Sequence, residues 1–205
     1  MKAGLANFSY SQAESDAIAV AMASARPWDC EAAEAIKRRI KAFHLQLGEE
    51  LCCYCYRDVK GEFSMVLDIE HILPKRFYKP LTFDIRNLSV ACKRCNMKMK
   101  RDDLDFLLLP VDVADIEDGE KYRLIHPNID GRDAHLQRLV FQRNAKKMVK
   151  YVVIGDSEKG KFSYEYFRLQ EFEVDSFDTA QGANQAPVAE LDAITSIRAL
   201  VREIE

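Results

Sequence analysis

The feature that most constrains this chain is a pair of C-x-x-C motifs, Cys52–Cys55 and Cys92–Cys95. Each motif presents two sulfurs from one tight turn, and two such turns complete a tetrahedral four-thiolate site with no open position. We therefore expect Cys52, Cys55, Cys92 and Cys95 to hold a structural zinc ion, Zn²⁺. Such an ion would fix both ends of the stretch 51–101 to each other. The 36 residues between the pairs must then have a structure of their own.

The alternative use of these cysteines is disulfide formation in a secreted protein. Residues 17–25 resemble the apolar core of a signal peptide, but Glu14 and Asp16 precede them, where a secretion signal carries positive charge. The sequence has no apolar run long enough to span a bilayer. We therefore expect a cytoplasmic protein without membrane association, in which thiolates bind metal. Cys30 and Cys53 are interpreted as packed thiols outside the metal site.

The segment between and after the two motifs predicts a strand, a long loop, a second strand and a helix. Residues 64–71 alternate in polarity and are rich in β-formers, and residues 88–91 form a second short strand. Pro74 lies in the irregular loop between them. Residues 95–102 are polar and basic with two methionines, a composition that favours a helix.

A second polar group lies at the ends of these elements and consists of Glu70, His71 and Asn96. Carboxylate and amide oxygens are hard ligands that suit Mg²⁺ or Mn²⁺. A histidine beside such an ion, but not bound to it, is placed to deprotonate water. A lone histidine is more often a buried structural residue. Here it adjoins a carboxylate within a metal-fixed segment, which favours a catalytic role.

Positive charge is concentrated in the same segment. Residues 74–101 hold nine Lys or Arg residues against one acid, Asp84, in a chain whose net charge is −3. A confined basic surface is typical of phosphate binding, although runs of charge also occur on ordinary solvated surfaces.

In combination, these residues resemble the HNH endonucleases, which have a ββα-metal fold. The resemblance covers about a quarter of the chain. It rests on Glu70-His71-Ile-Leu-Pro74, then Asn87-Leu88, then Cys92-Lys-Arg-Cys95-Asn96.

The resemblance implies a role for each matching residue. Glu70 is implied to be the acidic ligand of a catalytic Mg²⁺ or Mn²⁺, and His71 the general base. Asn87 is implied to hold the histidine loop by hydrogen bonds. Asn96 replaces the last histidine of the family, as in its HNN variants, and is implied to be the second ligand. Met99 stands where the family often has a lysine. The candidate phosphate-binding residues are Arg76, Lys79, Lys98 and Lys100.

The activity implied is metal-dependent hydrolysis of phosphodiester bonds in nucleic acid, with DNA favoured over RNA. More loosely, Ile-Glu-His-x-x-Pro-Lys75 with the later His126-Pro-Asn-Ile-Asp130 resembles the small HNH subunit of Septu-type and retron-associated antiphage systems. In those systems an ABC-type ATPase partners the nuclease, which implies such a partner and an antiviral function here. His44, His126 and His135 are interpreted as structural or surface residues.

Rival functions are weighed against the same residues. A non-catalytic zinc-finger-like module that binds nucleic acid or a protein partner explains the cysteines and the basic segment. It does not explain Glu70, His71 and Asn96 together. A zinc deaminase requires a His/Cys-x-Glu element before its C-x-x-C motif, and none precedes Cys92. The zinc-protease motif H-E-x-x-H is absent.

The first part of the chain predicts two helices that brace this module. Ser11 and Glu14 form a capping box at the start of an alanine-rich helix that ends before Pro27. Asp29 is expected to cap a second helix that runs to about Leu47.

The predicted fold class is α+β, with a ββα-metal core between N-terminal helices and a C-terminal hairpin plus helix. The expected parts are a helical brace over residues 1–50, the HNH module with its zinc site over residues 51–103, and an extension over residues 104–205. The extension is expected to pack on the core or on a partner. Its expected elements are strands 149–154 and 162–169, a linker over 174–187, and a helix from Pro187.

Overall fold

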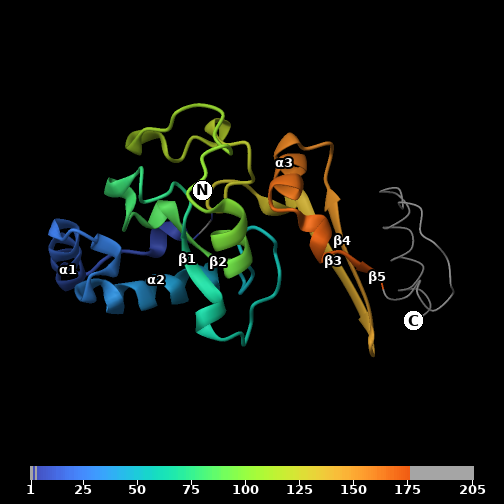
Figure 1. The fold of residues 1–205 in the computed structure, drawn as a ribbon, viewed down its shortest axis with the longest axis horizontal. Helices are drawn as coiled ribbons and strands as arrows, with labels where there is room; N and C mark the ends of the chain where they lie inside the picture. The colour runs from blue at the N-terminus through green and yellow to red at the C-terminus, as the bar shows by residue number, and fades with distance from the viewer. Residues whose placement is uncertain (1, 3, 176–205) are drawn as a thin grey trace. The chain divides into compact units, whose positions relative to one another are not determined.

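The computed structural model describes residue 2 and residues 4–175 (Figure 1). Helices and strands are mixed in these residues, so the predicted α+β class is confirmed. The chain divides into two compact units, Met1–Arg132 and Asp133–Glu205. The first unit contains the predicted brace, the predicted HNH module and the beginning of the predicted extension. The helix predicted from Pro187, and the linker beyond residue 175, lie outside the described residues.

The centre of the first unit is a two-stranded antiparallel sheet followed by a helix. Strand β1 (Leu67–His71) pairs with β2 (Leu88–Cys92), and Glu70 lies opposite Ser89. The helix Arg94–Lys100 follows β2 at once (Figure 1), and it is wound as a π-helix. The predicted order of strand, loop, strand and helix is therefore confirmed.

Helix α1 (Gln12–Ala23) starts as the sequence predicts. The Ser11 hydroxyl accepts a hydrogen bond from the Glu14 N–H at 3.3 Å, and the Glu14 carboxylate accepts one from the Ser11 N–H at 2.8 Å. This reciprocal capping box satisfies two N–H groups that the first turn of a helix leaves unpaired.

Helix α2 (Glu34–Leu47) ends where predicted, at Gly48, but starts later than predicted. Asp29 does not cap it. Its carboxylate pairs with Arg26 at 2.6 Å in a short turn, and a further 3₁₀ turn precedes α2. Because this second turn separates Asp29 from α2, the N-terminal position of α2 falls to Ala33 and no side chain caps it.

Helix α2 packs on one face of the sheet. Ile36 and Ile40 form a buried cluster with Leu88 of β2, and Ile69 of β1 packs against its edge. Because side chains alternate along a strand, the neighbours Asp68 and Glu70 point to the other face, toward the helix Arg94–Lys100. The sheet thus separates an apolar layer from a polar one.

The second unit contains a hairpin of β3 (Leu136–Arg143) and β4 (Lys146–Val153), extended by β5 (Val174–Asp175). A hairpin was predicted from strands 149–154 and 162–169; the first of these coincides with β4, but its hairpin partner is β3, which precedes it. The predicted second strand, 162–169, is instead mostly helix α3 (Glu158–Tyr166). The reason is local, because the Ser157 hydroxyl accepts the Gly160 N–H at 3.0 Å and starts a helix where a turn was expected.

Short 3₁₀ turns join these elements. They are Leu5–Asn7, Pro27–Asp29, Glu31–Ala33, Ser64–Val66, Lys79–Leu81, Ile85–Asn87, Val113–Asp115, Gly119–Lys121, Arg132–Ala134 and Leu169–Phe172. Among the described helices, none combines the length and the apolarity needed to cross a membrane.

Candidate active site and metal centre

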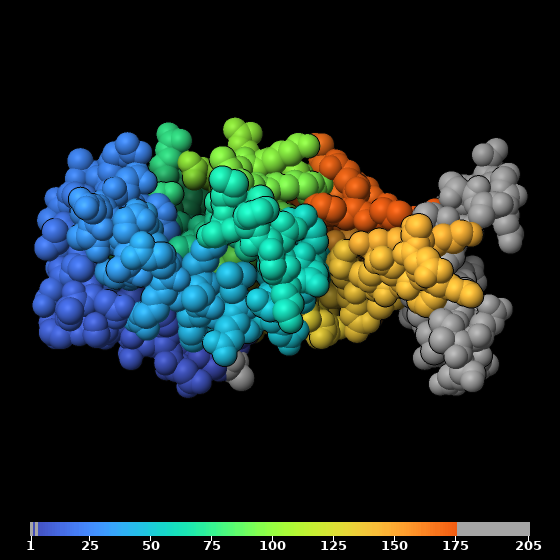
Figure 2. All heavy atoms as spheres, turned by 90° about the horizontal axis from the view of Figure 1, so that it is seen from below, coloured from blue at the N-terminus to red at the C-terminus, as the bar shows by residue number. Residues whose placement is uncertain are grey.

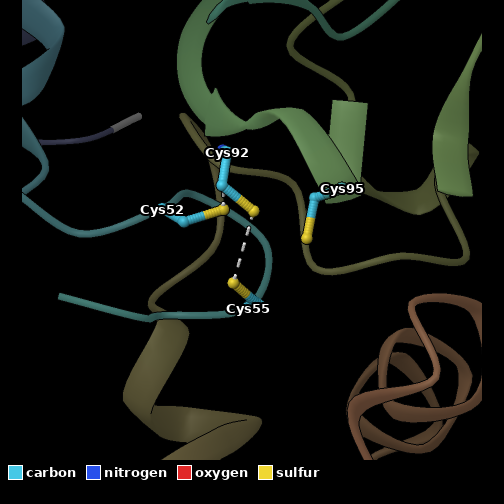
Figure 3. A group of neighbouring side chains, drawn as sticks. All are labelled: Cys52, Cys55, Cys92 and Cys95. Atoms are coloured by element: carbon cyan, nitrogen blue, oxygen red, sulfur yellow. Dashed lines mark hydrogen bonds between the residues drawn. The ribbon is translucent and has the colours of Figure 1, made fainter. Parts of the chain in front are cut away.

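Four buried thiols converge at one point. The Sγ atoms of Cys52, Cys55, Cys92 and Cys95 all lie within 4.8 Å of one another (Figure 3). The Cys55 and Cys92 sulfurs are 3.9 Å apart. Sulfurs at the corners of a tetrahedron with metal–sulfur bonds of about 2.3 Å are separated by about 3.8 Å. Hydrogen bonds from the thiols of Cys52, Cys55 and Cys95 hold the pKa of Cys92 well below its usual range. The donor set therefore fits a closed, structural metal site.

The backbone around Cys52 forms the tight turn that such a site needs. The Tyr56 N–H donates to the Cys52 carbonyl at 3.0 Å, and Tyr56 has a φ of 53°, in the left-handed region. The Cys92 N–H donates to the Cys52 sulfur at 3.3 Å. The Cys53 N–H donates to the Val90 carbonyl at 3.0 Å, which ties the turn to β2. Cys53 takes no part in the four-sulfur group.

Two polar contacts cross from β1 to the helix Arg94–Lys100. The Asn96 amide Nδ2 donates to Asp68 Oδ2 at 3.1 Å, and Lys100 Nζ lies 2.7 Å from Glu70 Oε1. Asp68 also pairs with Lys93 at 2.9 Å. The structure thus places Asn96 beside Asp68 and places Glu70 beside Lys100. Among the described residues, no hydrogen bond or ion pair joins Glu70 to Asn96.

The Glu70–Lys100 pair is fully enclosed, with each side chain 1% exposed. The Tyr54 hydroxyl donates to the same carboxylate at 3.1 Å, and Lys100 Nζ also donates to the His71 carbonyl at 3.0 Å. Burial raises the pKa of Glu70, and the charge of Lys100 opposes that effect. Lys100 was expected on the phosphate-binding surface. Its ammonium group is instead buried, where it cannot meet a nucleic-acid backbone.

The His71 imidazole lies on the opposite side of β1 and is 7% exposed. Its Nε2 is 3.0 Å from the Thr82 carbonyl oxygen. A carbonyl only accepts, so Nε2 carries the proton and Nδ1 is left to accept one. The Trp28 ring and the imidazole make a T-shaped contact, with ring centroids 4.4 Å apart. Burial lowers the pKa of His71 to about 3, so its ring is neutral at neutral pH.

Asn87 closes the loop that follows His71. Its Oδ1 accepts from the Leu73 N–H at 2.8 Å, and its Nδ2 donates to the Leu73 carbonyl at 3.0 Å. The Ile72 N–H donates to the Asn87 carbonyl at 2.9 Å. Three hydrogen bonds therefore fix the backbone just beyond the histidine, as a loop-holding role requires.

Asn128 supports the same region and was not among the predicted site residues. Its Nδ2 donates to the carbonyls of Arg86 and Leu88, at 2.8 and 2.7 Å, on either side of Asn87. The His126 N–H donates to the Asp130 carboxylate at 2.7 Å and closes the turn that carries Asn128. The sequence signal for this contact was the His126-Pro-Asn-Ile-Asp130 motif itself.

Two open hollows flank Trp28. One hollow, of about 330 Å³, is lined in part by Asp68 and Asn96. The other, of about 620 Å³, is lined in part by Arg76 and Lys79. Trp28 and Lys75 line both hollows. Lys98 is also exposed, on the helix Arg94–Lys100. Asp68 was not among the predicted site residues, although it shares a strand face with Glu70.

Comparison with known proteins assigns this segment. Residues 52–102 match the HNH endonuclease family, so the four thiols, both central strands and the following helix lie in an HNH domain. A curated relative is the Septu protein PtuB of Bacillus thuringiensis, 28% identical over 137 residues. The match covers 67% of this chain and 43% of that relative, so it spans less than half of the relative's length. The predicted resemblances to HNH endonucleases and to a Septu-type protein are confirmed.

The buried ion pair gives a first prediction. Replacing Lys100 with methionine should destabilise the fold by about 3–5 kcal/mol, because it leaves the Glu70 carboxylate buried without a counter-charge. The double variant Glu70→Gln/Lys100→Met should recover much of that loss, since it removes both charges. Urea unfolding measures all three proteins. Lys98→Met is the control, an exposed lysine on the same helix, and should unfold like the wild type. Wild-type stability of Lys100→Met would contradict the importance of the pair.

Proposed function

We propose that this chain is a metal-dependent endonuclease that hydrolyses phosphodiester bonds in nucleic acid, with DNA favoured over RNA. The observation that carries the proposal is the placement of His71. Its neutral imidazole ends β1 within the HNH segment, and Asn87 fixes the loop beyond it with hydrogen bonds. Exposed cations at Arg76, Lys79 and Lys98 support contact with phosphates.

In this proposal the His71 Nδ1 accepts a proton from the water that attacks phosphorus. The hydrogen bond from Nε2 to the Thr82 carbonyl holds the ring in the tautomer that this step needs. A Mg²⁺ or Mn²⁺ ion bound by Asn96 and Glu70 would offset the negative charge that develops at phosphorus and on the leaving 3′ oxygen. To serve as that ligand, the Glu70 carboxylate must release Lys100 and bind the metal ion instead. Asp68 already contacts Asn96 and lines the open hollow.

We propose Zn²⁺ as the ion of the four-thiolate site, with a structural role. Four sulfurs leave no position for water or substrate, so the site does not take part in hydrolysis. Its contribution is to join the Cys52 turn to the corner between β2 and the helix that carries Asn96.

The similarity to the Septu protein PtuB supports a role in antiphage defence. On the same basis we propose that the chain has an ABC-type ATPase as its partner subunit and that it acts in the cytoplasm. The alternative function is a non-catalytic zinc module that binds nucleic acid or a protein. One observation favours this alternative: Lys100 and Tyr54 both bind the Glu70 carboxylate, which is therefore not free to bind a metal ion in this conformation.

A cleavage assay tests the proposal. The purified chain is incubated with plasmid DNA, single-stranded DNA and RNA, in Mg²⁺, in Mn²⁺ and with a chelator. Cleavage is expected with either ion and should stop with the chelator. If no nucleic acid is cleaved even when the ATPase partner is supplied, the non-catalytic alternative replaces the nuclease.

A further inference from the structure

Helix α2 borders the hollow that contains Asp68 and Asn96, although it lies outside the HNH segment. Lys37, Arg38 and Lys41 of α2 line this hollow together with Lys75 of the loop after β1. On the face drawn in Figure 2, the blue atoms of α2 lie against the cyan and green atoms of the central segment. The hydrophobic contact of Ile36 and Ile40 with the sheet fixes this position.

The three cations of α2 differ in their contacts. Lys37 Nζ binds the Glu34 carboxylate and the Trp28 carbonyl, and Lys41 Nζ binds the Leu67 carbonyl at 2.6 Å. Both lysines thus serve the local structure. Arg38 is exposed and has no hydrogen bond or ion pair with the described residues. Its guanidinium is therefore available to a ligand in the hollow.

The two hollows have a common border near the proposed base. They share Trp28 and Lys75, and the Trp28 ring contacts the His71 imidazole. Arg38 lies in the first hollow and Arg76 in the second. Cations that line two hollows separated by Trp28, which contacts the proposed base, are suited to a chain of phosphates. Arginine binds phosphate through paired N–H groups, which makes Arg38 an effective contact.

We propose that α2 forms one wall of the nucleic-acid channel, with Arg38 as its phosphate contact and Lys75 as the neighbouring cation. The group that this wall would bind is the sugar–phosphate backbone of the nucleic acid. The wall would therefore add affinity and position the substrate, without recognising its base sequence. The inference rests on the proposed nuclease function. It assigns to the N-terminal helices a binding role in addition to bracing the sheet.

The test compares Arg38→Ala with Arg39→Ala, both in a His71→Ala background that prevents cleavage. Arg39 is the adjacent residue of α2, but its guanidinium is bound to the Glu14 carboxylate and lines neither hollow. The two substitutions remove the same charge. Binding of short labelled duplex and single-stranded DNA is followed by fluorescence anisotropy over a range of salt concentrations. Thermal melting checks that each variant is folded.

Arg38→Ala should weaken binding several-fold and reduce the slope of log Kd against log salt by about one, the loss expected for one phosphate contact. Arg39→Ala should bind like its background. If both variants bind like the background, in a salt-dependent manner, α2 is not part of the channel and the nuclease proposal stands. If the His71→Ala protein with an intact α2 binds neither DNA at any salt concentration, the result contradicts the proposed nuclease function itself, and the α2 proposal falls with it.

Discussion

Replacing His71 with alanine should lower the rate of phosphodiester cleavage by about 10²–10⁴-fold, the usual contribution of a positioned general base. The substitution removes Nδ1 as proton acceptor, together with the hydrogen bond to the Thr82 carbonyl and the contact with Trp28. It leaves the four thiols and the exposed cations unchanged. Folding, bound zinc and affinity for nucleic acid should therefore survive. Single-turnover cleavage, thermal melting, elemental analysis and binding measurements check the four properties in turn.

Asn96→Ala is the matched comparison for this variant. Asn96 is a proposed ligand of the divalent ion, and its amide contacts Asp68 across the polar face of the sheet. Loss of the amide should therefore weaken binding of the ion. Raising the Mn²⁺ concentration should restore part of the activity of Asn96→Ala. It should not restore His71→Ala, which has no defect in binding the ion. Equal cleavage by His71→Ala and wild type would show that another group accepts the proton.

The parts of the fold that the sequence predicted are those set by short-range patterns. The C-x-x-C spacing defines a tight turn, so the convergence of Cys52 with Cys55 could be expected from that motif alone. Strand β1 was predicted because alternation over residues 64–71 has the period of an extended chain. The same argument failed for residues 162–169. There the Ser157 cap started a helix, and a few residues of apolar pattern do not distinguish the two structures.

The pairing across the polar face could not be predicted in the same way. Alternation indicates that Asp68 and Glu70 share a face, but not which helix residue lies opposite each one. That choice depends on how the helix Arg94–Lys100 is wound and rotated on the sheet, and it is a π-helix, with wider turns than an α-helix. The result is Asn96 beside Asp68 and Lys100 beside Glu70. The burial of Lys100 follows from this rotation.

Removing the four-thiolate site should have the largest effect on stability. We expect about one tightly bound Zn²⁺ per chain, and we expect Cys92→Ser to lose it. Apparent binding free energies of about 10–16 kcal/mol are typical of structural zinc in small domains, and this energy is coupled to folding. Cys92 ends β2, and its sulfur is one of the four that converge with the Cys52 turn, so the variant loses the thiolate that links this turn to the sheet through the metal. Elemental analysis and thermal melting measure both effects.

Cys53→Ser is the control for the zinc prediction, because Cys53 adjoins Cys52 but lies outside the four-sulfur group. It should retain zinc and most of the melting temperature of the wild type. Loss of zinc from Cys53→Ser as complete as from Cys92→Ser would mean that Cys53 binds the ion in place of Cys52. A wild-type protein without zinc, or a Cys92→Ser variant that melts like it, would contradict the metal site. Since the thiols join the Cys52 turn to the corner that precedes Asn96, zinc loss should also abolish cleavage in a protein whose His71 is intact.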